Sequence, residues 1–289
     1  MSNSVVTGKM PIKIHLVTLL VILVGSRAQA EESRIINGED AELGQFPYQA
    51  KLIIQTDQGR ALCGGSLISE EWVLTAAHCV ESARSVEVTL GAVDLNDQGN
   101  DGRTVLNSTE YVRHPNYQAS SASNDVAVVR LPERVTYSDR IQPVKLPTGH
   151  DDYNRRLALV SGWGKTRDMG GVAQKLQYTT LTVIRNNECS LFYGPGTIQP
   201  TTLCCRGANR RSTCNGDSGG PLVLEDDKTQ IGVVSFGNVI GCEKMFPVGF
   251  ARLTEFTDFI RETTGVEAMR APVRNHVSNF LLLNMPNRN

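Results

Sequence analysis

The stretch TCNGDSGGPLV, residues 213–223, places a serine and an aspartate among three glycines, ahead of a short apolar run. Glycines allow the backbone to turn tightly and leave its N–H groups uncovered. Such a turn could simply precede a strand, or it could present Ser218 as a nucleophile. A serine hydroxyl is a weak nucleophile unless a base activates it. The question is therefore whether the chain supplies a base and a group that orients this base.

The strongest candidate for the base is His78, which stands beside Cys79 in the segment LTAAHCV. Cys63 lies sixteen residues before Cys79, and a disulfide between the two would fix the segment that carries the histidine. The other histidines lie in the apolar start of the chain, in polar segments or near the C-terminus: His15, His114, His150 and His276.

The candidate for the orienting carboxylate is Asp125, in the segment SNDVAVVRL. It stands just ahead of a strongly apolar strand, where a charge is costly unless it is paired. Most other acidic residues lie in polar runs. Asp217 is the second candidate, but its place next to Ser218 suggests a different role.

The segments TAAHC, NDVAVVRL and GDSGGPL occur in the order His, Asp, Ser, and in this the chain resembles the chymotrypsin family of serine proteases. RIINGEDA resembles the activation site of that family and SGWGKT its central strand, while SFG and FPVGFARL resemble its substrate pocket. The resemblance covers residues 35–264 approximately, which is nearly all of the chain after its apolar start.

The chain also reads as an all-β protein, because short β-branched runs alternate with clusters of Gly, Asn, Asp and Pro. The resemblance implies two six-stranded antiparallel β-barrels, over about 35–145 and 146–253, and a C-terminal helix over about 254–265. Thr254 could cap this helix and Gly265 could end it. Between them, Phe256, Phe259 and Ile260 form an apolar stripe at helical spacing.

The resemblance also assigns roles in peptide-bond hydrolysis. His78 takes the proton of Ser218 as the serine attacks a carbonyl, and Asp125 orients the histidine ring. The N–H groups of Gly216 and Ser218 stabilise the oxyanion that develops. Cleavage of the Arg34–Ile35 bond by a separate trypsin-like protease frees an amine that pairs with Asp217.

Specificity follows from the pocket that the resemblance outlines, with Ser212 at its floor and Ser235, Phe236, Gly237 and Val248 along its walls. Because Ser212 is neutral, Arg and Lys side chains would find no counter-charge there. We therefore expect a chymotrypsin-like endopeptidase that cleaves after apolar residues. The alternatives are an elastase-like preference for small residues and an inactive homologue that acts as a binding module.

The first thirty residues predict a secretory signal peptide: Lys9 and Lys13 precede the apolar run LVTLLVILVG, and Ala28-Gln29-Ala30 ends the segment. Its removal would leave a propeptide of residues 31–34 and a secreted, extracellular protein. The apolar run is too short for a membrane anchor. Seven cysteines in such a protein indicate disulfides and one thiol left over. The family resemblance pairs Cys214 with Cys242, and Cys189 with either Cys204 or Cys205.

The remaining features lead to weaker expectations. Asn107 begins a glycosylation sequon, expected on a surface loop, and residues 266–289 are expected to form a disordered tail. The acidic loop that starts at Asp94 resembles a calcium loop but has Val105 at the twelfth position, so we expect no metal there. With a net charge of −1, we expect no nucleic-acid or membrane partner. The family resemblance implies peptide or protein substrates, protein inhibitors, a monomer and no cofactor.

Overall fold

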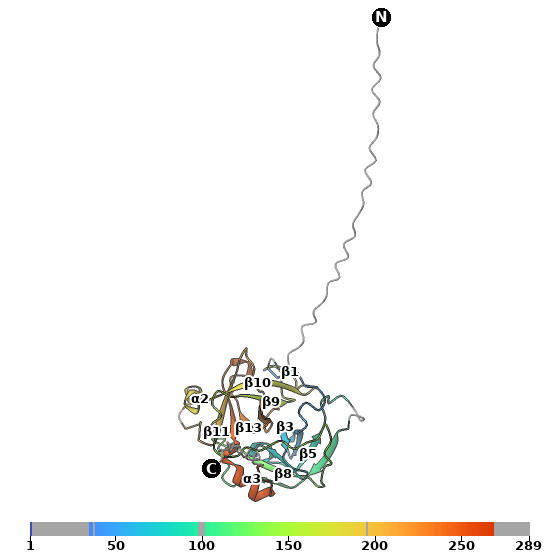
Figure 1. Ribbon diagram of the computed structural model, residues 1–289, viewed down its shortest axis with the longest axis vertical. Helices are drawn as coiled ribbons and strands as arrows, with labels where there is room; N and C mark the ends of the chain where they lie inside the picture. The colour runs from blue at the N-terminus through green and yellow to red at the C-terminus, as the bar shows by residue number, and fades with distance from the viewer. Residues whose placement is uncertain (2–34, 37, 98–101, 195, 269–289) are drawn as a thin grey trace, which may run out of the picture. The chain divides into compact units, whose positions relative to one another are not determined.

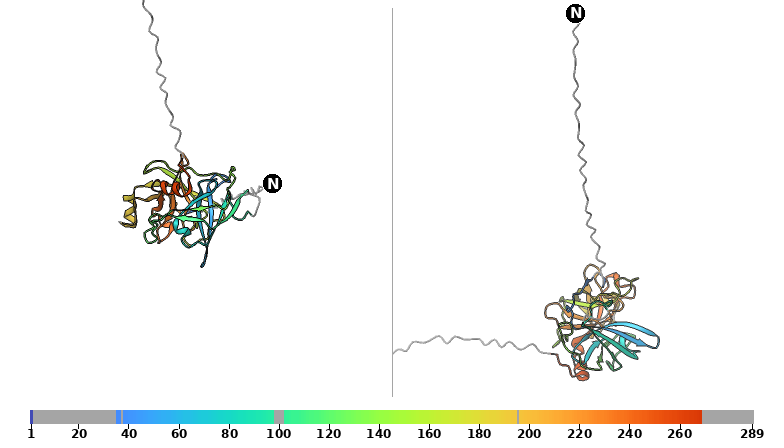
Figure 2. Two further views of the ribbon diagram at one scale, coloured as in Figure 1. Left: turned by 90° about the horizontal axis from the view of Figure 1, so that it is seen from below. Right: turned by 90° about the vertical axis from the view of Figure 1, so that its right-hand side faces the viewer.

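A computed structural model describes residues 1, 35, 36, 38–97, 102–194 and 196–268 of the chain. Its strands form two sheets, and Figures 1 and 2 show the blue-to-green strands of the first gathered apart from the yellow-to-orange strands of the second. The first sheet contains β2 (Gln49–Thr56), β3 (Gly59–Leu67), β4 (Trp72–Thr75), β5 (Ser85–Leu90), β6 (Thr104–Ser108), β7 (Tyr111–Arg113) and β8 (Ala127–Arg130). The second contains β1 (Glu39–Asp40), β9 (Leu157–Gly162), β10 (Gln177–Ile184), β11 (Thr202–Gly207), β12 (Pro221–Leu224), β13 (Gln230–Phe236) and β14 (Val248–Arg252).

The first sheet runs in the order β6-β5-β2-β3-β4-β8-β7. Its two outer strands, β6 and β7, are consecutive in the chain and only Thr109 and Glu110 separate them. The chain can therefore connect the two outer strands only if the sheet curls. Counted as one bent strand, β6 and β7 make this a six-stranded sheet. Among the described residues no strand pairing joins its two outer strands, so the sheet is a curled half-barrel.

The second sheet closes through hydrogen bonds. Its order is β10-β11-β14-β13-β12-β9, and β9 pairs again with β10, with Leu181 opposite Ala158. The short strand β1 adds to the outside of β10. Along β10, buried and half-buried residues alternate, as expected when every second side chain points into a barrel. The second sheet is thus a closed barrel and the first is a curled half-barrel, which together match the chymotrypsin-like arrangement that the sequence predicted.

Buried polar side chains join the two barrels. The Ser66 hydroxyl of β3 donates to Gln230 of β13 at 2.6 Å, and the Ser161 hydroxyl of β9 donates to Gln49 of β2 at 2.6 Å. All four residues are at most 2% exposed. Because an unpaired buried polar group is costly, these pairs favour one specific docking of the barrels over others.

The C-terminal helix begins later than the sequence suggested. Thr254 lies in a 3-10 turn, η2 (Leu253–Glu255), and α3 spans Thr257–Thr264 with Phe256 at its start. Thr254 is therefore not the cap. Gly265 ends the helix in a left-handed conformation, as predicted. The expected apolar stripe packs inward: Phe256 and Ile260 are fully buried.

Disulfides join Cys63 to Cys79, Cys214 to Cys242, and Cys189 to Cys204. The last bond selects between the two alternatives that the sequence left open. Cys189 lies on helix α2 (Asn186–Tyr193), which packs beside β11. Because neighbouring residues of a strand point to opposite sides, Cys204 can meet α2 while Cys205 points into the core of the second barrel.

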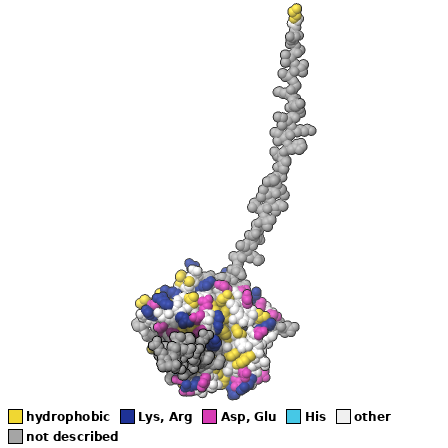
Figure 3. All heavy atoms as spheres, in the orientation of Figure 1, with side chains coloured by type: hydrophobic (Ala, Val, Ile, Leu, Met, Phe, Trp, Pro, Cys, Tyr) yellow, Lys and Arg dark blue, Asp and Glu magenta, His cyan; other side chains and the backbone are white. Residues whose placement is uncertain are grey.

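The surface carries both signs of charge. Figure 3 shows Lys and Arg side chains interspersed with Asp and Glu on the face in view. Within the described residues, no helix is long and apolar enough to cross a membrane. The predicted signal peptide of residues 1–30, the predicted propeptide and most of the tail lie outside the residues that the structure describes, apart from Met1.

The buried Cys205 leads to a test. Burial raises the pKa of its thiol far above the usual range, and only the thiolate is strongly nucleophilic. We expect no reaction of the native protein with Ellman's reagent, and one thiol per chain after denaturation without reductant. The Cys205→Ala variant should show none in either state. A prompt reaction of the native protein would contradict this burial.

Candidate active site

Strand pairing brings His78 and Asp125 together. The end of β4 pairs antiparallel with the start of β8, with Thr75 opposite Ala127. His78 lies three residues after Thr75, on the single helical turn α1 (Ala77–Val80), and Asp125 lies two residues before Ala127. The Cys63–Cys79 disulfide holds α1 against β3. Two residues that are 47 positions apart are thus placed side by side.

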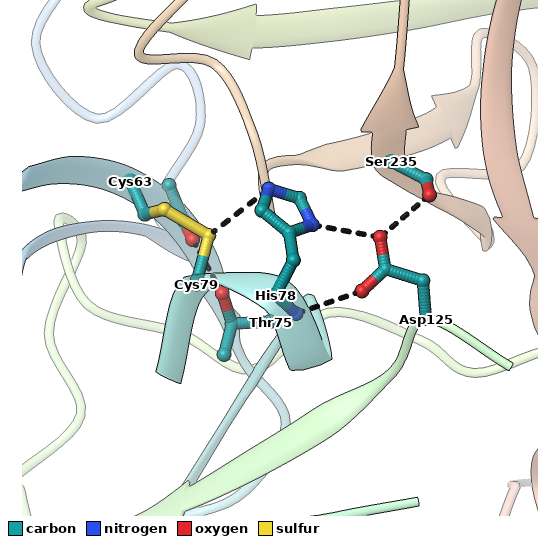
Figure 4. Close-up of polar contacts among 7 residues, drawn as sticks. Cys63, Thr75, His78, Cys79, Asp125 and Ser235 are labelled. Carbon is teal, nitrogen blue, oxygen red and sulfur yellow. Dashed lines mark hydrogen bonds and ion pairs between the residues drawn. A yellow bond between two sulfur atoms is a disulfide. The ribbon is translucent and has the colours of Figure 1, made fainter. Parts of the chain in front are cut away.

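Asp125 holds the histidine through two bonds (Figure 4). One carboxylate oxygen lies 2.7 Å from His78 Nδ1, and the other accepts the backbone N–H of His78 at 2.9 Å. The Ser235 hydroxyl of β13 also donates to Asp125, at 2.6 Å. The aspartate is 1% exposed, while the imidazole is 32% exposed. This geometry favours a proton on Nδ1, which leaves Nε2 free to accept one.

Ser218 comes from the second barrel and reaches the first through its backbone. Its carbonyl accepts the N–H of Gly64 on β3 at 2.7 Å. A Cβ on the next residue, Gly219, would lie 2.2 Å from the Thr75 hydroxyl and 2.5 Å from the Gly64 carbonyl oxygen. Only glycine permits this approach. The glycines of the motif therefore bring the serine against the end of β4.

The serine and histidine side chains are not hydrogen-bonded to each other. Among the described residues, no hydrogen bond joins Ser218 to the His78 ring, whose Nε2 lies 3.8 Å from the Cys79 sulfur (Figure 4). Catalytic hydrogen bonds are often long in the absence of substrate. The backbone N–H groups of Gly216 and Ser218 donate to no acceptor among these residues, so both can bind a ligand oxygen.

Asp217 is a completely buried carboxylate. Its two oxygens accept the backbone N–H groups of Gly164 at 2.8 Å and Cys214 at 2.9 Å. No cation among the described residues pairs with it. Burial raises its pKa to about 6, although the two backbone hydrogen bonds act to lower that pKa. Ile35 is also fully buried, and Ile36 pairs with Ser212. The segment after Arg34 thus lies against the pocket wall.

A pocket of about 220 Å³ opens beside Ser218. Ser212 and Val248, 5% and 2% exposed, line it together with Ser235, Phe236 and Gly237. None of the described residues that line it carries a charge. A Cβ on Gly237 would meet no atom within 4 Å, so this wall is open to a bulky side chain.

The trypsin family model matches residues 35–260 of this chain. The chain belongs to the trypsin family. It is 45% identical to a collagenase from Hypoderma lineatum over 82% of this chain and 90% of that protein. It is 36% identical to a chymotrypsin from Phaedon cochleariae, over 78% and 81% of the two chains. The solved structure of HL collagenase matches with a TM-score of 0.74 and 44% identity, covering 81% of this chain and all of the other.

At the predicted site residues, the structure differs from the sequence analysis of this trypsin-family chain by one added contact and one corrected placement. Ser235, expected only as a pocket wall, also bonds Asp125, and no local pattern marks that second contact. Asn107 was expected on a loop but lies exposed on strand β6. Arg34 and residues 98–101 of the acidic loop lie outside the described residues, so the structure does not place them.

The raised pKa of Asp217 predicts a pH-dependent stability of the uncleaved chain. Protonation stabilises the fold fully below about pH 4, and this contribution is lost as the pH rises through about 6. The rise of about two units in the pKa of Asp217 corresponds to about 3 kcal/mol in the free energy of unfolding. The free energy of unfolding in urea is measured for the Ser218→Ala precursor and for the same precursor carrying Asp217→Asn. Between pH 4 and pH 7, the stability of the Asp217→Asn variant relative to the other should rise by about this amount. An unchanged difference between the variants would contradict an unpaired carboxylate.

Proposed function

We propose that the chain is a secreted serine endopeptidase, made as an inactive precursor, that cleaves protein substrates after apolar residues. The observation that carries the proposal is the joining of Asp125 to His78 in the first barrel beside Ser218 and its two free N–H donors in the second. All three catalytic side chains are intact, which argues against an inactive homologue.

The geometry supports a double-displacement mechanism. His78 Nε2 takes the Ser218 proton as Oγ bonds to the substrate carbonyl carbon, and Asp125 stabilises the imidazolium that results. The oxyanion lies against the N–H groups of Gly216 and Ser218, each worth about 3 kcal/mol of barrier. The imidazolium then protonates the leaving amine, and water hydrolyses the acyl-enzyme by the reverse sequence.

Activation would follow from the buried carboxylate. Cleavage after Arg34 gives Ile35 a charged amine, and pairing with Asp217 would relieve the cost of an unpaired buried charge. Ile35 has a φ of 46°, which β-branched residues avoid, so a free N-terminus there also loses a constraint. Because Asp217 lies between Gly216 and Ser218, its pairing would fix both oxyanion donors.

The surrounding biology is also a proposal. The signal peptide at 1–30 supports secretion into the extracellular space, where a separate trypsin-like protease would cut after Arg34. Protein inhibitors of serine proteases are expected partners, and we propose a monomer. The exposed Asn107 on β6 is accessible to a glycan. Cleavage is expected to need no cofactor and no metal.

The catalytic assignment is tested by substitution in the processed enzyme. Ser218→Ala, His78→Ala and Asp125→Asn should each abolish nearly all turnover of a peptide anilide and leave the thermal unfolding temperature close to that of the parent. Because the three residues act as a unit, the triple variant should be little worse than Ser218→Ala, which is expected to lose about 10⁶ in kcat. Near-normal turnover by His78→Ala would refute the assignment.

Apolar specificity rests on the composition of the pocket. A buried Arg or Lys would lose its hydration and find no negative group among the lining residues. Gly237 leaves space for a flat ring, while the two methyl groups of Val248 narrow the deep end. This favours Leu, Met and Phe over Trp. The elastase-like alternative, with Ala and Val preferred, applies if Val248 closes the pocket further. A relative at 35% identity is named chymotrypsin-like elastase family member 3B, from Homo sapiens.

The specificity test compares matched peptide anilides that end in Phe, Leu, Ala and Arg. We expect kcat/KM to be highest for Leu and Phe, and no cleavage after Arg, so the enzyme could not process its own Arg34. Val248→Gly should raise turnover of Trp and Tyr substrates most, because it lengthens the pocket. Preferred cleavage after Arg would refute the role given to Ser212, and a strong preference for Ala would favour the elastase-like alternative.

A further inference from the structure

Two loops beside the substrate pocket are joined by an exchange of hydrogen bonds. The carboxylate of Asp168, in the loop between β9 and β10, accepts the backbone N–H of Cys242 at 2.6 Å. The carboxylate of Glu243 in turn accepts the backbone N–H of Asp168 at 3.0 Å. Both bonds have a charged acceptor, so they are stronger than bonds between neutral groups. We call this pair of contacts the Asp168 clamp.

Gly241 makes the Asp168 clamp possible. Its φ is 140°, in the region that favours glycine. A Cβ at this position would lie 2.4 Å from one carboxylate oxygen of Asp168 and 3.0 Å from the other. The two loops can therefore approach this closely only because residue 241 has no side chain.

The segment that the clamp holds is a wall of the pocket. Val239, Gly241, Cys242 and Phe246 all line the cavity beside Ser218. Phe246 is half-buried, but burial does little to fix the rest of this wall: Val239 is 101% exposed, Ile240 66% and Met245 49%. At Cys242 the fixed points are the disulfide to Cys214 and the bond to Asp168.

The loop that carries Asp168 is itself anchored at the catalytic motif. The N–H of Gly164 donates to Asp217, and the N–H of Lys165 donates to the Asn215 carbonyl at 2.8 Å. The Asp168 clamp therefore connects this anchored start of the loop to the outer wall of the pocket. Neither hydrogen bond of the clamp involves Ser218 or His78.

We propose that Asp168 is a positioning residue for substrate specificity, which fixes the Gly241–Cys242 wall so that the pocket is formed before an apolar side chain enters. This rests on the proposed function, since it concerns the same pocket. Without the clamp the reacting groups stay in place, but the substrate must order the wall when it binds. The free energy of this ordering weakens substrate binding. The effect falls on KM, and only for substrates whose side chain fills the pocket.

The test compares Asp168→Ala and Asp168→Asn in the processed enzyme. With a Leu or Phe anilide, for which chemistry is slow and KM follows binding, Asp168→Ala should raise KM about tenfold and leave kcat within about twofold. Asp168→Asn keeps an oxygen that can accept the Cys242 N–H, so its KM should stay within about threefold of the parent. Acylation by p-nitrophenyl acetate, whose acetyl group does not fill the pocket, should be unchanged. Asp57→Ala, which removes an exposed carboxylate of the first barrel, is the matched control.

Gly241→Ala gives an independent arm. It forces the Asp168 carboxylate away, so it should raise KM as Asp168→Ala does, and the double variant should be no worse than either alone. Equal KM values for Asp168→Ala and the parent, or an equal loss with p-nitrophenyl acetate, would overturn the inference. The inference would also be overturned if the effects of Gly241→Ala and Asp168→Ala on KM were fully additive, or if Asp168→Asn raised KM as much as Asp168→Ala. If the parent enzyme does not cleave apolar anilides, the proposed function is overturned instead. The KM comparison is then made with the substrate that the enzyme prefers.

Discussion

The hydrogen bond from the Gly64 N–H to the Ser218 carbonyl is the contact on which the site depends, because it joins the two barrels at the nucleophile. A Cβ on Gly64 would lie 2.9 Å from the Cα of Gly220, so the two backbones meet directly at this point. The buried Ser66–Gln230 and Ser161–Gln49 pairs hold the same docking. The serine and histidine belong to different barrels, so even a small shift between the barrels would separate them.

Asp217 adds a second constraint, which is electrostatic. The carboxylate is placed where no water reaches it, and its two backbone donors oppose the rise in its pKa without cancelling it. The fold thus contains one unfavourable charge directly beside the nucleophile. A charge with that cost would respond to the arrival of a cation, and the proposed activation by cleavage after Arg34 relies on this response.

The sequence predicted the features that depend on local pattern, and it missed those that depend on tertiary contact. The motifs around His78, Asp125 and Ser218 predicted the fold and the site, because each motif consists of particular residues at fixed spacing. Thr254 has the properties of a cap, yet it lies in a 3-10 turn and the helix begins only after the buried Phe256. The choice of Cys204 depended on which side of β11 faces helix α2. The Asp168 clamp joins residues 74 positions apart and has no sequence signature.

The adjacency of Cys204 and Cys205 has a consequence for biosynthesis. In an unfolded chain the two thiols are nearly equivalent partners for Cys189, and nothing in the covalent structure distinguishes them. They differ only once β11 has paired with β10 and β14, because a slip of one residue would turn each side chain to the opposite face. At this strand, therefore, packing has to guide oxidation. A secretory compartment that oxidised the chain before the sheet had formed would trap an isomer in which a cysteine meant for the core is tied to the surface helix.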